Sequence, residues 1–204
     1  MTARTAAIFS VAVALTSVEA ASISKQQADL FSRKVAQIVV QGDAVQKPGT
    51  KVEKPGTKKT QVSETELNSW FAYSAKPLLP AGVTDPRITM VGNGKVAGQA
   101  VVDLDTIAKK KQSGGTFDVW NLVGGKVPVN VAGTLRTKDG IGTFLLESAD
   151  VSGLPLPKSF LQEVVSYYSR TPAHPQGVKI DDPFELPAAI RQIDVGSGQA
   201  VIVQ

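Results

Sequence analysis

Apolar and polar residues alternate along much of the chain after residue 87, in three stretches that each contain a glycine-bearing turn. These stretches cover 88–104, 127–151 and 190–203. Alternation with a period of two is typical of strands buried on one face, and Asn93-Gly94 and Asp139-Gly140 favour tight turns. The pattern predicts three antiparallel hairpins. In the returning strand at 141–151 both faces carry apolar groups, Ile141, Leu145 and Val151 on one and Phe144, Leu146 and Ala149 on the other.

Three other segments carry apolar residues at helical spacing. Residues 25–40 predict a first amphipathic helix, and its polar face is less basic than that of a membrane-surface helix, so packing on protein is favoured. A second helix at 63–75 begins with Ser63 and Glu66, which match a capping box. The third, at 158–169, follows a proline that is tolerated at a helix start.

Hairpins separated by helices indicate an α+β fold rather than a parallel doubly wound sheet. We expect a curved, mainly antiparallel sheet built from the three hairpins and packed on the two amphipathic helices at 63–75 and 158–169. The length of 204 residues favours one domain, which we assign to 63–204. An amphipathic helix within 21–41 and a basic linker rich in proline and glycine over 42–62 are expected to precede it.

The first 20 residues have the order of a signal peptide. Arg4 precedes an apolar run at 6–15, and Val18-Glu19-Ala20 resembles a cleavage site. A membrane anchor is the alternative, but the run is shorter than the roughly 20 apolar residues that span a bilayer. We therefore expect cleavage near Ala20 and export to the periplasm or cell envelope. The chain has no cysteine, which excludes disulfides and thiolate chemistry.

Residues with catalytic potential are few. The one histidine, His174, has no histidine partner, which favours a surface loop over a general base or metal ligand. Asp103 and Asp105 could form an acid–base pair or calcium site, yet the calcium-loop spacing is missing, and a strand end with a helix cap is favoured. A Gly-x-Ser-x-Gly motif is absent. We expect no catalytic residue, metal or cofactor, and hence a non-enzymatic protein.

The formal net charge of +4 comes from 22 basic and 18 acidic residues. Lys109, Lys110 and Lys111 form a run that could contact an anionic membrane surface, although a solvated charge run is favoured, because three lysines fall short of a polybasic cluster. The modest excess is weak support for nucleic-acid binding, and we expect none.

Aromatic residues gather on the second and third helices, where they present large apolar faces to the sheet. They could fill an ordinary core or line a lipid-sized cavity between sheet and helices. The residues expected to line such a cavity are Trp70, Phe71, Phe144, Phe160, Leu161, Val164 and Tyr168.

Four short features bear on this choice. Residues 62–68 open a helix behind an N-terminus that is expected to be exported, and residues 96–102 form a predicted strand. The segment 153–157 precedes a long apolar helix, and a hairpin closes the chain. In these features the chain resembles the LmeA-like phospholipid-binding proteins of the tubular lipid-binding (TULIP) superfamily. The resemblance covers about 63–204 and implies a TULIP-like curved sheet that holds acyl chains against a helix.

Three functions follow for testing. The first is an envelope protein that binds or carries lipid or phospholipid in the apolar cavity. The second is a non-enzymatic envelope scaffold with a filled core, which binds a protein through 25–40 or the loop around His174. The third is a hydrolase that uses Asp103 or Asp105, and the missing catalytic constellation disfavours it.

Overall fold

The computed structural model describes residues 22–46, 57–103, 105, 125–172 and 174–204. The helices within these residues are α1 (Lys25–Gln46), α2 (Glu64–Tyr73) and α4 (Lys158–Tyr168), with a 3-10 turn, η1 (Lys76–Leu78). The strands are β1 (Lys59–Ser63), β2 (Val83–Gly92), β3 (Lys95–Asp103), β4 (Lys126–Lys138), β5 (Ile141–Val151), β6 (Leu154–Pro155), β7 (Phe184–Glu185), β8 (Gln192–Val195) and β9 (Gln199–Val203). The fold is α+β, as the sequence predicts.

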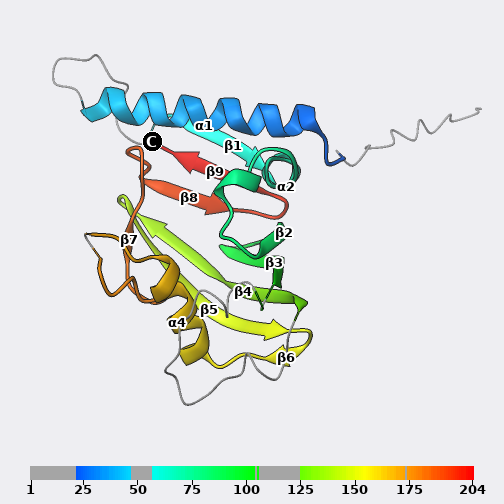
Figure 1. Cartoon of the computed structure of the whole chain (residues 1–204). Helices are drawn as coiled ribbons and strands as arrows, with labels where there is room; N and C mark the ends of the chain where they lie inside the picture. The colour runs from blue at the N-terminus through cyan, green and yellow to red at the C-terminus, as the bar shows by residue number, and fades with distance from the viewer. Residues whose placement is uncertain (1–21, 47–56, 104, 106–124, 173) are drawn as a thin grey trace, which may run out of the picture.

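The strands form two antiparallel sheets (Figure 1). The larger has the order β2-β3-β4-β5-β6, with β7 pairing the start of β5, and the smaller has the order β1-β9-β8. All three predicted hairpins are present as β2-β3, β4-β5 and β8-β9. The third hairpin pairs with β1 instead of extending the large sheet, because residues 59–63 supply a partner strand, and the sequence placed 59–62 in the linker.

The two predicted turns have the backbone geometry that their residues favour. Asn93 and Gly94 have φ of 54° and 80°, and Asp139 and Gly140 have φ of 50° and 84°. Positive φ at both central positions is the signature of the turn whose twist matches paired strands. These residues fix the registers of β2 with β3 and of β4 with β5.

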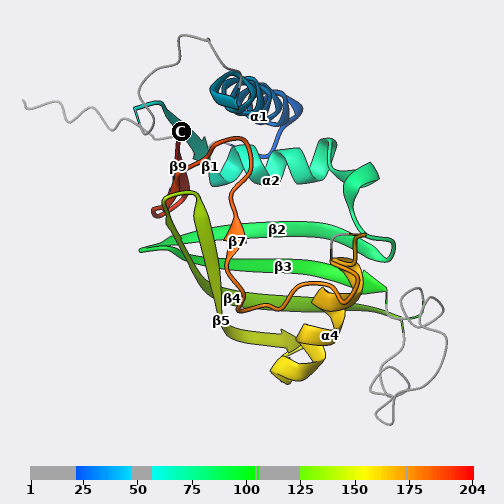
Figure 2. The ribbon, with the colours of Figure 1, turned by 90° about the vertical axis from the view of Figure 1, so that its left-hand side faces the viewer.

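The β4-β5 hairpin bends and connects the two sheets. Its register shifts between Ala132 and Gly133, and a Cβ atom on Gly133 would lie 2.5 Å from both the Leu145 carbonyl oxygen and Phe144 Cζ. A side chain at position 133 would collide with β5, so the shift in register here requires glycine. In Figure 2 the paired strands curve towards β9. At the far end the Thr137 hydroxyl donates to the Ile193 carbonyl at 3.0 Å and accepts from the Ile193 amide at 2.8 Å.

The most buried cluster lies where α2 and the two sheets meet. Met90, Val195 and Ala200 are 7–8% exposed, and the partly buried residues around them are Leu67, Ile88, Val96, Leu135 and Ile193. Among the described residues, the largest side chain that is completely buried belongs to Ser69. Large apolar side chains therefore cluster in this fold without being fully enclosed.

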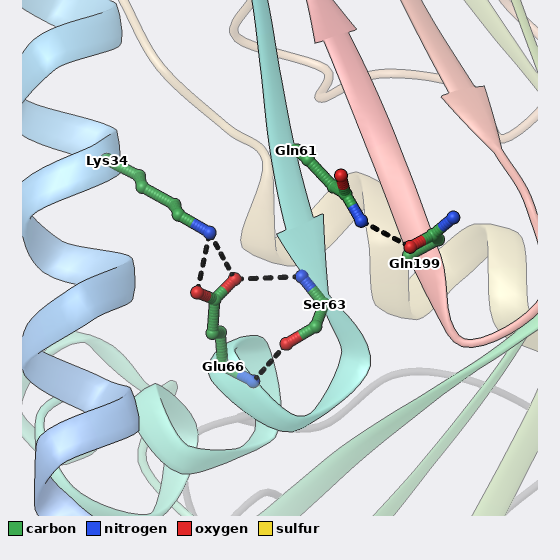
Figure 3. Close-up of polar contacts among 5 residues, drawn as sticks. All are labelled: Lys34, Gln61, Ser63, Glu66 and Gln199. Carbon is green, nitrogen blue, oxygen red and sulfur yellow. Dashed lines mark hydrogen bonds and ion pairs between the residues drawn. The ribbon is translucent and has the colours of Figure 1, made fainter. Parts of the chain in front are cut away.

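Helix α1 lies across α2 and the small sheet, and it extends to Gln46, beyond the predicted end of the helix (Figure 1). Ala28 and Ile38 are buried, and Gln204 donates to the Ile38 carbonyl at 2.8 Å. Lys34 reaches both carboxylate oxygens of Glu66 at 2.5 and 2.7 Å (Figure 3). The prediction that this helix packs on protein is confirmed.

The capping box at the start of α2 is also confirmed. The Glu66 amide donates to Ser63 Oγ at 3.1 Å, and the Ser63 amide donates to the Glu66 carboxylate at 2.8 Å (Figure 3). Glu66 thus stabilises the start of α2 and anchors α1 through Lys34. The side chains of Gln61 on β1 and Gln199 on β9 are hydrogen-bonded beside it.

Candidate ligand cavity

A cavity of about 740 Å³ lies between the bent part of the large sheet, helix α4 and the segment 174–185 that leads into β7. Its apolar lining comes from Val131, Phe144, Leu146, Leu161, Val165, Val178, Ile180, Pro183 and Phe184. The polar residues at its boundary are His174, Lys179, Asp182 and Glu185. Its volume falls within the range of roughly 300–1,000 Å³ found for small-molecule sites.

Strand β5 supplies one wall through residues two positions apart, which project to the same face of the sheet. Phe144 and Leu146 line the cavity, and Val131 lines it from β4. At the start of β5, the Phe184 ring covers Gly142, on which a Cβ would lie 2.7 Å from the ring. The glycine thus brings Phe184 close enough to close that end of the cavity.

Helix α4 directs apolar residues to the cavity and polar residues to the segment 177–180. Leu161 and Val165, four residues apart, line the cavity. On the polar side, Gln162 donates to the Val178 carbonyl at 3.0 Å and accepts from the Ile180 amide at 2.9 Å. A Cβ on Gly177 would lie 2.0 Å from the Ser166 carbonyl oxygen, so this contact requires glycine.

The charged residues near the cavity belong to exposed turns. The His174 amide donates to the Thr171 carbonyl and hydroxyl, each at 3.0 Å, which holds His174 in a tight exposed turn. Asp181 forms an ion pair with Lys158 at the start of α4, and its neighbour Asp182 lies at the cavity with His174. Within the described residues, no group of three or more metal-ligating side chains gathers here or elsewhere.

Two of the predicted cavity residues, Phe144 and Leu161, line this cavity. Val164 lies half-buried on α4 and is not part of the lining, where Val165 takes the position expected for it. Phe160 and Tyr168 belong to α4 by their backbones, and their side chains lie outside the described part of the structure.

Trp70 and Phe71 occupy a different part of the molecule. The Trp70 ring packs against Phe31 of α1, with centroids 5.5 Å apart, and against Phe71 at 5.4 Å. Phe71 lines a second cavity of about 530 Å³ beside the end of α2 and the start of β2, whose charged residues are Lys76, Asp85, Arg87 and Lys126. The aromatic residues of α2 therefore hold α1 and do not join those facing α4.

Other predicted features lie partly or wholly outside the described residues. These are the signal peptide at 1–20, positions 47–56 of the linker, and Lys109, Lys110 and Lys111. Asp103 ends β3, as expected, and the carboxylate of Asp105 accepts from the Gly125 amide at 3.2 Å.

Sequence reasoning did not assign seven of the nine apolar lining residues to the cavity. Leu146 and Val165 could have been found, because they share a strand face and a helix face with Phe144 and Leu161. Val131 lies on the apolar face that Val127, Val129 and Leu135 also occupy in the alternating pattern of the sequence. The other four, Val178, Ile180, Pro183 and Phe184, lie in or next to irregular backbone, where no periodicity indicates which way a side chain points.

Comparison with protein-family models gives no match, and neither curated proteins nor solved structures contain a significant match to the chain. In the described residues, no helix combines the length and apolar character needed to cross a bilayer.

Proposed function

We propose that the protein binds a lipid, or a phospholipid through its acyl chain, in the cavity between β4-β5 and α4, and performs no catalysis. The observation that carries this proposal is the cavity itself, with nine apolar side chains around about 740 Å³. A ligand that transfers apolar surface from water to such a lining gains about 25 cal/mol per Å². The resemblance to LmeA-like proteins points to the same ligand class and stays a prediction.

Incomplete burial of the large apolar side chains supports a ligand in preference to a filled core. Phe184 at the cavity is 44% exposed, and Val178 is 37% exposed. In a closed core these side chains would pack at nearly crystalline density, with few voids. An acyl chain inside the cavity would supply the missing contacts.

The test is native mass spectrometry of the mature protein, gently purified from its own envelope, followed by lipid extraction. We expect a bound lipid that is released on unfolding. Leu161→Trp places extra volume in the cavity, and we expect it to weaken rebinding of the extracted lipid by at least about tenfold.

The matched control is Leu154→Trp on β6, because Leu154 is 67% exposed and does not line the cavity. Thermal unfolding of both variants checks that each still folds. A protein that carries no lipid and takes none up from vesicles would contradict the proposal, as would equal binding by Leu161→Trp and the control.

We further propose that the protein acts in the periplasm or cell envelope, on the basis of the signal-peptide pattern at 1–20. N-terminal sequencing of the protein from its native source should give a mature chain that begins after Ala20. An uncleaved N-terminus would contradict export by this route.

A second candidate function is a protein-binding scaffold, and exposed valines on α1 favour it. Val39 and Val40 are 46% and 68% exposed, although the helix is already anchored by its opposite side. Crosslinking in the envelope distinguishes the two functions. A saturable partner that is lost in Val40→Asp, together with a lipid-free cavity, would favour the scaffold.

A further inference from the structure

The edge of β5 is open in its middle. On one side β5 pairs with β4 along its length. On the other, β7 pairs only with Ile141 and Gly142, and β6 pairs only with Asp150 and Val151. Within the described residues, no strand pairs with this side of β5 between 143 and 148. The open stretch covers about 20 Å at roughly 3.3 Å per residue.

The ladder pattern identifies which backbone groups face this open edge. Gly140 and Gly142 face β7, as the bond from the Leu186 amide to the Gly140 carbonyl at 2.7 Å shows. The side to which a residue directs its N–H and C=O alternates along an antiparallel strand. Phe144 and Leu146 therefore direct these groups to the same side as Gly140 and Gly142. No hydrogen bond from another described residue reaches these four groups.

The same two residues line the apolar cavity. A ligand in the cavity therefore lies beside a strand edge with two N–H donors and two C=O acceptors, next to apolar side chains. An acyl chain alone leaves all four unmatched, and an ester offers acceptors but no donor for the carbonyls. An N-acylated amino acid offers both on one side, because the amide N–H and the C=O of the same residue point the same way in an extended chain, as they do in a neighbouring strand.

We propose that the preferred ligand carries an acyl chain joined through an amide, as in an N-acylated amino acid or peptide. The chain lies against Leu161 and Val165, and the N–H and C=O of the acylated residue pair with the open edge at Phe144 or Leu146. This inference rests on the proposed lipid-binding function and specifies its ligand. A second copy of β5 does not fit this edge, because β6 and β7 occupy both ends of it.

The experiment compares three probes that share one chain and one carboxylate, by calorimetric titration of the full mature protein. N-dodecanoylglycine carries the amide N–H, dodecanoyloxyacetate replaces it with an ester oxygen, and N-dodecanoylsarcosine replaces the hydrogen with a methyl group. We expect the amide to bind about tenfold more tightly than either analogue, because only the amide donates to a β5 carbonyl. N-acetylglycine, which lacks the chain, should bind at least about a hundredfold more weakly.

Each alternative outcome has a distinct meaning. Equal binding of the three dodecanoyl probes would overturn the amide preference and leave the lipid-binding function standing. Binding of N-acetylglycine as tight as that of N-dodecanoylglycine would overturn the role of the chain. If none of the probes binds and the native protein carries no lipid, the proposed function fails together with the inference.

Discussion

Glu147 lies on the exposed face of the large sheet, where side chains from three strands meet. Its carboxylate accepts from the Thr134 hydroxyl at 2.6 Å and from Lys95 at 3.3 Å. The Thr134 hydrogen bond, followed by that of Lys95, lowers the pKa of this carboxyl from its ordinary 4.5. Both contacts favour the ionised form in the folded state.

The first prediction concerns pH. Because the folded-state pKa is below the unfolded value, Glu147 stabilises the fold above about pH 4.5, and this contribution is lost as pH falls through the folded pKa. Urea unfolding of wild type and Glu147→Gln should therefore differ near neutral pH and converge in acid. Thr134→Val should reduce the difference more than Lys95→Met. A difference that grows on acidification would contradict this assignment.

Helix α2 covers the outer edge of β2 with two side chains one turn apart. Asn68 donates to the Ile88 carbonyl and accepts from the Ile88 amide, both at 2.8 Å, and Glu64 accepts from the Met90 amide at 2.8 Å. These bonds take the place of a neighbouring strand. An edge that is satisfied in this way is protected from pairing with another chain.

The second prediction is that Asn68→Leu destabilises the protein by about 2 kcal/mol, because two backbone groups of Ile88 lose their partners. Urea unfolding measures the loss, and light scattering should show faster aggregation through the uncovered edge. Asn68→Asp keeps the acceptor but not the donor, and should fall between wild type and Asn68→Leu. Gln99→Leu on β3, an exposed position, is the control.

At this scale the sequence predicts the hairpins and the helices well, because alternation, Asn93-Gly94, Asp139-Gly140 and the Ser63 cap are local signals. It does not predict the partners of the third hairpin, since β1 is short and follows a basic linker. It also does not separate the aromatic residues of α2 from the α4 cavity. That separation arises from the packing of α1 on Trp70, which depends on contacts far apart in the chain.

The whole molecule joins an upper layer of α1, α2 and the small sheet to a lower half that contains α4 (Figure 1). The cavity lies beside α4 in this lower half. The close approach of Gly42 to Ala188 is one of the contacts that hold α1 in place. A Cβ there would lie 2.4 Å from the Ala188 carbonyl carbon, and the side-chain amide of Gln204 donates to the Ala188 carbonyl oxygen at 2.7 Å. The Ala188 backbone therefore leaves no room for a larger residue at position 42.

The third prediction is that Gly42→Val displaces α1 at a cost of about 1–3 kcal/mol. Trp70 reports this displacement, since its ring lies against Phe31 of α1. The chain has two tryptophans, and Trp120→Phe leaves only Trp70. In this background, the tryptophan fluorescence emission of Gly42→Val should be shifted to the red. Asp43→Ala, a change of an exposed neighbour, should leave the emission unchanged.

The pairing of β1 with β9 has a consequence for the order of folding. Lys59 pairs with Val203 and Ser63 with Gln199, so the small sheet closes a loop of nearly the whole domain. Contacts of such sequence separation form slowly, because the entropy of closing the loop is lost before the contacts stabilise it. During synthesis, the hairpins β2-β3 and β4-β5 can form as soon as they emerge. The strand β1 and the helix packed on it must wait for the last residues of the domain, and until then their apolar faces are available to chaperones.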